Sequence, residues 1–171
     1  YCAGIKEFPG IPGRMQFMPT KKRFEVVVDF AHTPQGLEAT LSALRDHMRK
    51  NKKKGRLIAI YGAAGLRDRS KRPLMGKIGV ELADIVIFTA EDPRTEDVWS
   101  IIRQLKENLT EGHDKVISIP DRSKAIAYAL KELAKSGDVI AVLGKGHEKS
   151  MWFGTTEYPW SDQEAVLESL K

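Results

Sequence analysis

The sequence predicts an α/β fold with an open, mostly parallel sheet and helices on both of its faces. Five short apolar runs recur along the chain, and each of the first four is followed by a segment whose apolar residues return every three or four positions. The runs are continuously apolar, which is typical of strands buried between two layers of helices. Strand and helix are therefore expected to alternate through most of the chain.

The first two strand and helix pairs lie in the first half of the chain. FEVVV at 24–28 is predicted to be a strand, after which Thr33 and Pro34 supply an N-cap and a first helical residue. RLIAIY at 56–61 is the second predicted strand. The buried stripes of the two helices are expected to be Leu37, Leu41, Leu44 and Met48 in the first, and Leu74, Ile78 and Leu82 in the second.

The pattern repeats in the second half. DIVIFT at 84–89, KVISI at 115–119 and DVIAVL at 138–143 are the remaining predicted strands. Two apolar stripes indicate the helices between them: Val98, Ile101, Ile102, Leu105 and Leu109 in one, and Ile126, Leu130 and Leu133 in the other.

The two ends of the chain depart from this rhythm. MWF and EYPW flank a short turn at 154–156, which predicts a β-hairpin, and Ser161 with Glu164 forms a capping box for a closing helix. Residues 1–22 contain three prolines and three glycines without periodicity. We therefore expect 1–22 to be a linker and 23–171 to be the domain.

Length and composition exclude several classes of protein. The chain has 171 residues, of which 42% are hydrophobic and 30% charged, as expected of one globular domain and not of a disordered chain. Cys2 is the only cysteine, so an intramolecular disulfide and a cysteine-built zinc site are excluded. No apolar run is long enough for a membrane span, and the first residues lack the pattern of a signal peptide. A soluble cytoplasmic protein is expected.

The net charge of +5 raises nucleic acid as a partner, but 28 basic residues are balanced by 23 acidic ones. The one dense basic run, RKNKKKGR at 49–56, falls where a helix is expected to end, and lysines stabilise a helix C-terminus. A solvated helix end is favoured over a binding patch. Neither nucleic acid nor membrane is expected as a partner.

Polar residues follow four of the predicted strands. In an open parallel sheet, ligands bind beyond the carboxyl ends of the strands, near the point where the strand order reverses. The residues placed there are Asp29, His32 and Thr33; Gly62, Gly65, Arg67 and Asp68; Glu91, Asp92 and Arg94; and Gly144, Lys145, His147 and Glu148. Arginines from two of these loops and carboxylates from two others could bind a zwitterion, for which a free amino acid is the obvious candidate.

Two of the loops carry further signals. YGAAGLRDRSKRP has small residues and the cations Arg67, Arg69, Lys71 and Arg72 near a helix start, so it could bind phosphate or carboxylate, although a plain strand-to-helix turn is an equal alternative. LGKGHE is a sharper signal, because two glycines bring the backbone close to a ligand beside both signs of charge. No metal site is expected, because His32 and His147 lack a third placed ligand.

Six collinear strings resemble the C-terminal domain of the Mur ligases, and in particular the MurE-like family of UDP-N-acetylmuramoyl-tripeptide synthetases. They are PGRMQ (12–16), VVVDFAHTPQGLEATLSAL (26–44), RDRSKRPLMG (67–76), EDPRTED (91–97), LGKGHE (143–148) and YPWSDQEAV (158–166). The resemblance covers nearly the whole chain. It implies a Rossmann-like domain that is part of an ATP-dependent amide ligase of peptidoglycan synthesis.

In such a ligase, a free diamino acid is added as the third residue to UDP-N-acetylmuramoyl-L-alanyl-D-glutamate through an acyl phosphate. The resemblance also implies N-terminal and central domains in the same parent chain, and the central domain would hold most of the ATP and Mg²⁺ contacts. Residues 1–12 are similar to the tail of that central domain. No catalytic residue is expected in this chain, which alone would be inactive.

By resemblance, Asp29 and His32 contact the nucleotide, and the amino acid is bound by Arg67, Glu91, Asp92, Arg94, Gly144 and Glu148. The family motif DNPR, associated with meso-diaminopimelate, appears here as EDPR, so diaminopimelate and lysine both stay open. Leu66 replaces an acidic residue of the family and receives no polar role. Two alternatives remain: a regulatory or interaction domain of the same fold without catalysis, and a domain similar to that of folylpolyglutamate synthetases.

Overall fold

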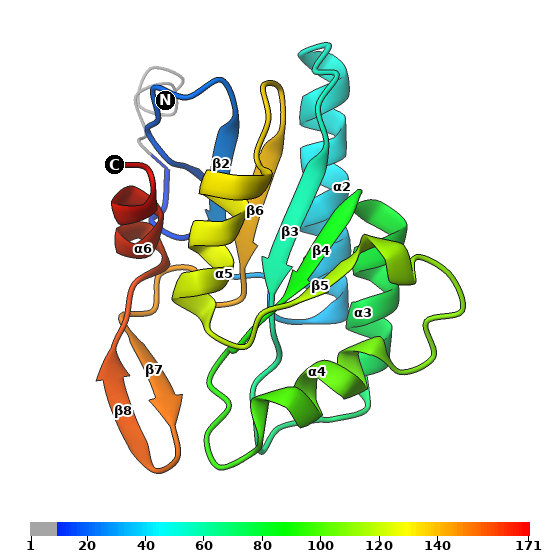
Figure 1. The fold of residues 1–171 in the computed structure, drawn as a ribbon, viewed down its shortest axis with the longest axis vertical. Helices are drawn as coiled ribbons and strands as arrows, with labels where there is room; N and C mark the ends of the chain where they lie inside the picture. Colours follow the sequence, from blue (N-terminus) through cyan, green and yellow to red (C-terminus); the bar gives the residue numbers. More distant parts are fainter. Residues whose placement is uncertain (1–9) are drawn as a thin grey trace, which may run out of the picture.

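The computed structural model describes residues 10–171, which form a six-stranded sheet, a separate hairpin and helices on both faces of the sheet (Figure 1). The strands of the sheet are β1 (Gln16–Phe17), β2 (Glu25–Asp29), β3 (Leu57–Tyr61), β4 (Ile85–Phe88), β5 (Val116–Ser118) and β6 (Val139–Leu143). Their order is β1-β2-β6-β3-β4-β5. All neighbours from β2 to β5 are parallel, and β1 is antiparallel to β2. The predicted α/β fold is confirmed.

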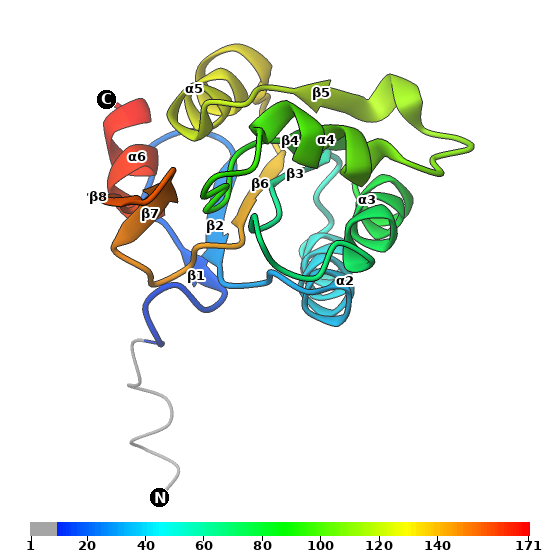
Figure 2. The same cartoon turned by 90° about the horizontal axis from the view of Figure 1, so that it is seen from below.

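The helices cover the sheet in two layers (Figure 2). One face is covered by α2 (Pro34–Lys50), α3 (Lys71–Leu82) and α4 (Val98–Lys106), and the other by α5 (Arg122–Tyr128), η2 (Ala129–Leu133) and α6 (Asp162–Ser169). A short turn, η1 (His113–Lys115), precedes β5. Within β2, Val27 packs with the first layer, and Val26 and Val28 pack with the second. Burial on both faces explains why the strands are continuously apolar.

The predicted caps and the hairpin are also confirmed. Thr33 Oγ1 accepts a hydrogen bond from Gly36 N at 3.1 Å, and Ser161 Oγ accepts one from Glu164 N at 3.3 Å. The hairpin consists of β7 (Ser150–Phe153) and β8 (Thr156–Pro159), which pair antiparallel. In Figure 1 it projects below the sheet, beside the loop that follows β4. The chain therefore adds a hairpin at the edge where the site was expected.

The structure differs from the sequence prediction in the packing of α3. Leu74, predicted to be buried, is 48% exposed, whereas Met75 and Ile78 lie in the core. Two glycines of α3 instead allow close packing: a Cβ on Gly76 would lie 1.7 Å from Leu105 O, and one on Gly79 would lie 2.0 Å from the Tyr61 hydroxyl. The buried face of α3 thus includes Gly76 and Gly79 and excludes Leu74. A stripe of apolar residues in the sequence does not indicate this arrangement.

The expected linker at 1–22 differs as well. Residues 1–9 lie outside the described residues, but Gln16 and Phe17 form β1, and Met18 is buried in the layer beneath α5 and α6. The segment at 16–18 is therefore part of the sheet and core. The boundary between linker and domain at residue 22 stays a prediction.

Candidate functional site

The carboxyl ends of β2, β6, β3 and β4 lie next to one another and carry the predicted site residues. In the sheet, β6 lies between β2 and β3, whereas β4 and β5 follow on the far side of β3. The direction in which consecutive strands are added to the sheet therefore reverses at β6. Gly144 N donates to Asp29 O at 3.1 Å, so the ends of β6 and β2 are directly joined. Polar groups from separate loops therefore share one edge of the sheet.

Lys145 brings two of the predicted residues together. Its Nζ lies 2.8 Å from Asp92 Oδ1 and 2.6 Å from Glu148 Oε2, and its side chain is only 1% exposed. Asp92 Oδ1 also accepts a hydrogen bond from Trp152 N in the hairpin at 3.0 Å. An ammonium and two carboxylates thus link the loops after β4 and β6 to β7.

Arg94 is fixed in place by backbone groups. Its Nη1 donates to Gly65 O at 2.7 Å, and its backbone pairs with the hairpin through Trp152 O and Gly154 N at 3.2 and 2.7 Å. The residue has a φ of +53°, which is unusual for a side chain other than glycine. Among residues 10–171, no carboxylate forms an ion pair with Arg94. The rest of its guanidinium fork makes no hydrogen bond to the described residues.

Glu91 is a buried carboxyl group beside Gly144. It is 6% exposed, and its Oε2 has no hydrogen-bond partner among the described residues. Burial raises the pKa of Glu91 to about 8, although the nearby cations Arg122, Lys71 and Lys145 oppose the shift. A Cβ on Gly144 would lie 2.5 Å from Glu91 Oε2, and the φ of +112° at this position favours glycine. The two residues are brought together as predicted.

The carboxylate of Asp29 is bound by its own chain. Its Oδ2 accepts from Met15 N at 2.7 Å, and its Oδ1 accepts from Ala31 N and Thr40 Oγ1 at 2.9 and 3.1 Å. It thereby fixes the turn after β2 and ties that turn to the start of the described chain. Three of the roughly four acceptor positions of this buried carboxylate are therefore used within the chain.

The His32 ring lies beside an aromatic neighbour. Its Nδ1 is 2.9 Å from Phe30 O, and its ring centroid is 4.5 Å from that of Phe30. Phe30 also contacts the His147 ring at 5.0 Å and lies under the Arg14 guanidinium at 4.5 Å. Neither Phe30 nor Arg14 was among the predicted site residues. The loops after β2 and β6 thus meet in a small cluster of rings.

The basic loop after β3 divides into exposed and buried cations. Arg67 is exposed, and no described residue pairs with it. Arg72, considered for anion binding, is fully buried and bonds internally to Glu96, Gln104 and Ala64 O at 2.9, 2.7 and 2.8 Å. Arg72 also holds the pKa of Glu96 down at about 2. The interpretation of Arg72 as an anion-binding residue is therefore wrong, because its Nη1 and Nη2 groups donate hydrogen bonds within the domain.

A second buried ion pair was not anticipated from the sequence. Arg122 on α5 and Asp162 on α6 are joined at 2.8 and 2.7 Å, and their side chains are 1% and 0% exposed. Arg122 also donates to Ala90 O and Leu143 O, the carbonyls that precede Glu91 and Gly144. The pair thus supports both site loops from below. Its members are 40 positions apart, so sequence spacing gave no signal.

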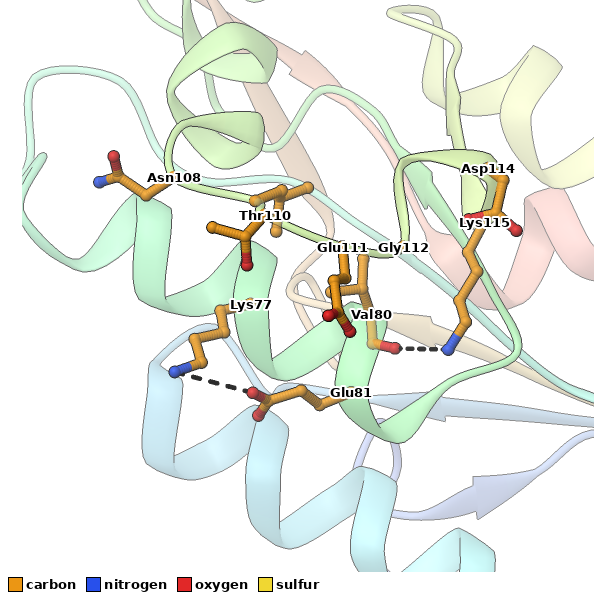
Figure 3. Close-up of a pocket in the computed structure, with 10 residues that line it drawn as sticks. Lys77, Val80, Glu81, Asn108, Thr110, Glu111, Gly112, Asp114 and Lys115 are labelled. Carbon is orange, nitrogen blue, oxygen red and sulfur yellow. Dashed lines mark hydrogen bonds and ion pairs between the residues drawn. The ribbon is translucent and has the colours of Figure 1, made fainter.

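A hollow of about 450 Å³ lies at the opposite edge of the sheet (Figure 3). It is bounded by α3 and the segment before β5, and it holds the pairs Lys77 with Glu81 and Lys115 with Val80 O. It contains none of the predicted site residues. Residues 10–171 show no group of three or more histidine, cysteine, aspartate or glutamate residues suited to a metal ion. No helix in that range is long and apolar enough to cross a membrane.

Comparison with known proteins identifies the family. The sequence model of the Mur ligase, glutamate ligase domain matches residues 13–146. A UDP-N-acetylmuramoyl-L-alanyl-D-glutamate--2,6-diaminopimelate ligase from Lawsonia intracellularis is 41% identical over 170 residues, which cover 99% of this chain and 34% of that protein. The ligase of the same name from Aquifex aeolicus is 42% identical over 160 residues, covering 94% of this chain and 32% of that protein.

A solved structure of a ligase with that name superposes with a TM-score of 0.84 at 34% identity, covering 94% of this chain and 32% of the solved one. The chain thus spans about a third of the length of the curated relatives that it matches. The match over residues 13–146 includes the loops after β2, β3 and β4 and the first residues of the loop after β6. The chain belongs to the Mur ligase, glutamate ligase domain family.

Proposed function

We propose that this chain is the C-terminal domain of a cytoplasmic, ATP-dependent ligase that adds 2,6-diaminopimelate to UDP-N-acetylmuramoyl-L-alanyl-D-glutamate in peptidoglycan synthesis. Two relatives with that name are 41% and 42% identical to it over nearly its whole length. This similarity favours the ligase over a folylpolyglutamate synthetase-like domain. The N-terminal and central domains of the parent would supply the remaining two thirds of the enzyme.

One observation carries the choice of diaminopimelate: Arg94 is fixed at the strand ends without a carboxylate partner from the described chain. Diaminopimelate has a distal carboxylate that lysine lacks, and a guanidinium fork binds a carboxylate through two parallel hydrogen bonds. Asp92, two positions away, could have neutralised Arg94. It pairs instead with Lys145 at 2.8 Å, so the guanidinium is left to the substrate.

The other predicted residues take roles that fit their positions. Glu148 is 38% exposed in its side chain and can accept a hydrogen bond from a substrate ammonium group. Gly144 lets the ligand approach the backbone, and the exposed Arg67 can move toward a bound carboxylate. Glu91 would act from beneath the site. Together these residues hold the amino acid so that its amino group can attack the acyl phosphate formed on the nucleotide substrate.

Asp29 and His32 are proposed to face the ATP nucleotide. Because Asp29 is bound by three donors of its own chain, its contribution would be to hold the turn that presents His32 and Phe30. By the family resemblance, ATP and Mg²⁺ would be bound mainly by the central domain of the parent.

The proposal is tested with the full-length parent enzyme, supplied with diaminopimelate or lysine in turn. Arg94→Ala should lower kcat/KM for diaminopimelate by roughly ten- to hundredfold, as expected for the loss of a charged hydrogen bond, and should affect lysine far less. Arg103→Ala is the matched control, because Arg103 is a 70% exposed arginine on α4.

Two results would overturn the proposal. A wild-type enzyme that uses lysine at least as well as diaminopimelate would refute the choice of substrate. An equal loss for both amino acids in Arg94→Ala would show that the arginine only braces its loop.

A further inference from the structure

Lys145 is a buried cation between two predicted ligand-binding carboxylates. Its Nζ contacts Asp92 Oδ1 and Glu148 Oε2 at 2.8 and 2.6 Å, and its side chain is 1% exposed. An ammonium group is costly to bury unless it is paired, and here two carboxylates surround it. Lys145 lies too deep for a ligand to reach it in place of these partners.

The backbone holds Lys145 in this position. It lies between Gly144 and Gly146, whose φ values are +112° and +52°, and its carbonyl accepts a hydrogen bond from Glu148 N at 2.9 Å. A Cβ on Gly146 would lie 2.7 Å from Gly13 O, so the turn is packed tightly against the segment before β1. The lysine therefore has little freedom to swing away from Asp92 and Glu148.

The charges around Lys145 determine what the edge can attract. Lys145 is the cation paired directly with both Asp92 and Glu148. Without Lys145, neither carboxylate would have an ion-pair partner among residues 10–171. An edge with excess carboxylate attracts an ammonium group, and a freed carboxylate two positions from Arg94 competes for its guanidinium.

We propose that Lys145 is a positioning residue that sets the amino acid preference of the site, because it holds Asp92 and Glu148 away from Arg94. Arg94 is thereby kept for a substrate carboxylate. The inference rests on the proposed function, since it assigns to Lys145 the selection of diaminopimelate over lysine. It differs from a merely structural role, which would support the binding of both amino acids equally.

The test measures kcat/KM for diaminopimelate and for lysine in the full-length parent. Lys145→Met should lower the ratio of kcat/KM for diaminopimelate to kcat/KM for lysine by roughly ten- to hundredfold, since the charged pairing of Arg94 with the substrate carboxylate is lost. The double variant Lys145→Met with Asp92→Asn also removes the freed charge two positions from Arg94 and leaves only that of Glu148, so it should recover most of the ratio. Lys77→Met is the control, because Lys77 is a 63% exposed lysine on α3 at the opposite edge of the sheet and should leave the ratio unchanged.

Thermal unfolding of each variant establishes that it is folded. If Lys145→Met does not fold, Lys145→Gln replaces it, since its amide can donate to a carboxylate without carrying a charge. If kcat/KM falls equally for diaminopimelate and lysine, so that their ratio stays constant, the inference is overturned. It is also overturned if the ratio changes in Lys145→Met and Asp92→Asn does not restore it. Failure of the proposed function has a different signature, namely a wild-type enzyme that does not prefer diaminopimelate.

Discussion

Glu91 is the residue whose ionisation is most affected by the fold. The protonated form suits its buried position, and the pKa of about 8 lies well above the ordinary value of 4.5. Between these two values the folded chain retains a proton that the unfolded chain has lost. The contribution of protonated Glu91 to the stability of the fold is therefore complete below about pH 4.5 and is lost as the pH rises toward 8.

We expect Glu91→Gln to change how stability depends on pH. In the unmodified chain this residue should lower the free energy of unfolding by up to about 1.4 kcal/mol per pH unit across that window. The variant lacks this contribution, so it should gain stability relative to the unmodified chain as the pH rises from about 5 to about 8. Urea unfolding of the 171-residue chain at several pH values measures the difference.

Glu81→Gln is the matched control, because Glu81 is an exposed glutamate on α3 with only a 3.7 Å ion pair to Lys77. It should show no such gain. A difference between Glu91→Gln and the unmodified chain that stays constant with pH would mean that Glu91 titrates like an exposed carboxylate.

The site residues differ in how far sequence could predict them. Glu91, Asp92, Arg94, Gly144 and Glu148 follow strand ends in recognisable motifs, and the structure brings them to one edge. The central place of Lys145 was not predicted, because its contact with Asp92 spans 53 positions. The internal bonding of Asp29 was equally hidden, since backbone donors such as Met15 N leave no trace in residue types. Motifs therefore locate a site without revealing which of its charges are already paired.

At the level of elements, strands were predicted more reliably than helix faces. All five predicted strands are present to within a residue or two, because burial on both faces leaves an unbroken apolar run. β1 was missed because an edge strand of only two residues has no periodicity to detect. The face of α3 was misjudged because Gly76 and Gly79 form its contact surface, and glycine carries no hydrophobic signal.

The contact between α3 and α4 predicts unequal losses of stability at two nearby positions of α3. Gly76→Ala places a methyl group 1.7 Å from Leu105 O, so the helices must separate, at a cost of about 1 to 3 kcal/mol. Leu74→Ala removes more atoms but from an exposed position, and it should cost less than about 1 kcal/mol. Denaturant midpoints of the two variants test this order. A larger loss for Leu74→Ala would show that the apolar stripe read from the sequence is the true contact.

For the molecule as a whole, we expect a stable but catalytically silent chain. The sequence contains no G-x-x-x-x-G-K-[ST] phosphate loop, and residues 10–171 lack a group of three metal-binding side chains. The purified chain should therefore unfold cooperatively, yet neither release phosphate from ATP nor join the two substrates. A phosphate-release assay checks this expectation. ATP turnover that disappears in Asp29→Ala would contradict it.

The pair of Arg122 with Asp162 also orders events during synthesis on the ribosome. Translation at about 5 to 20 residues per second separates the two partners by roughly 2 to 8 seconds. Throughout that interval Arg122, which hydrogen-bonds the carbonyls before Glu91 and Gly144, lacks Asp162, the carboxylate with which it forms its ion pair. The strand-end loops can thus reach their final arrangement only after α6 has emerged, which makes the binding edge one of the last parts of the nascent domain to mature.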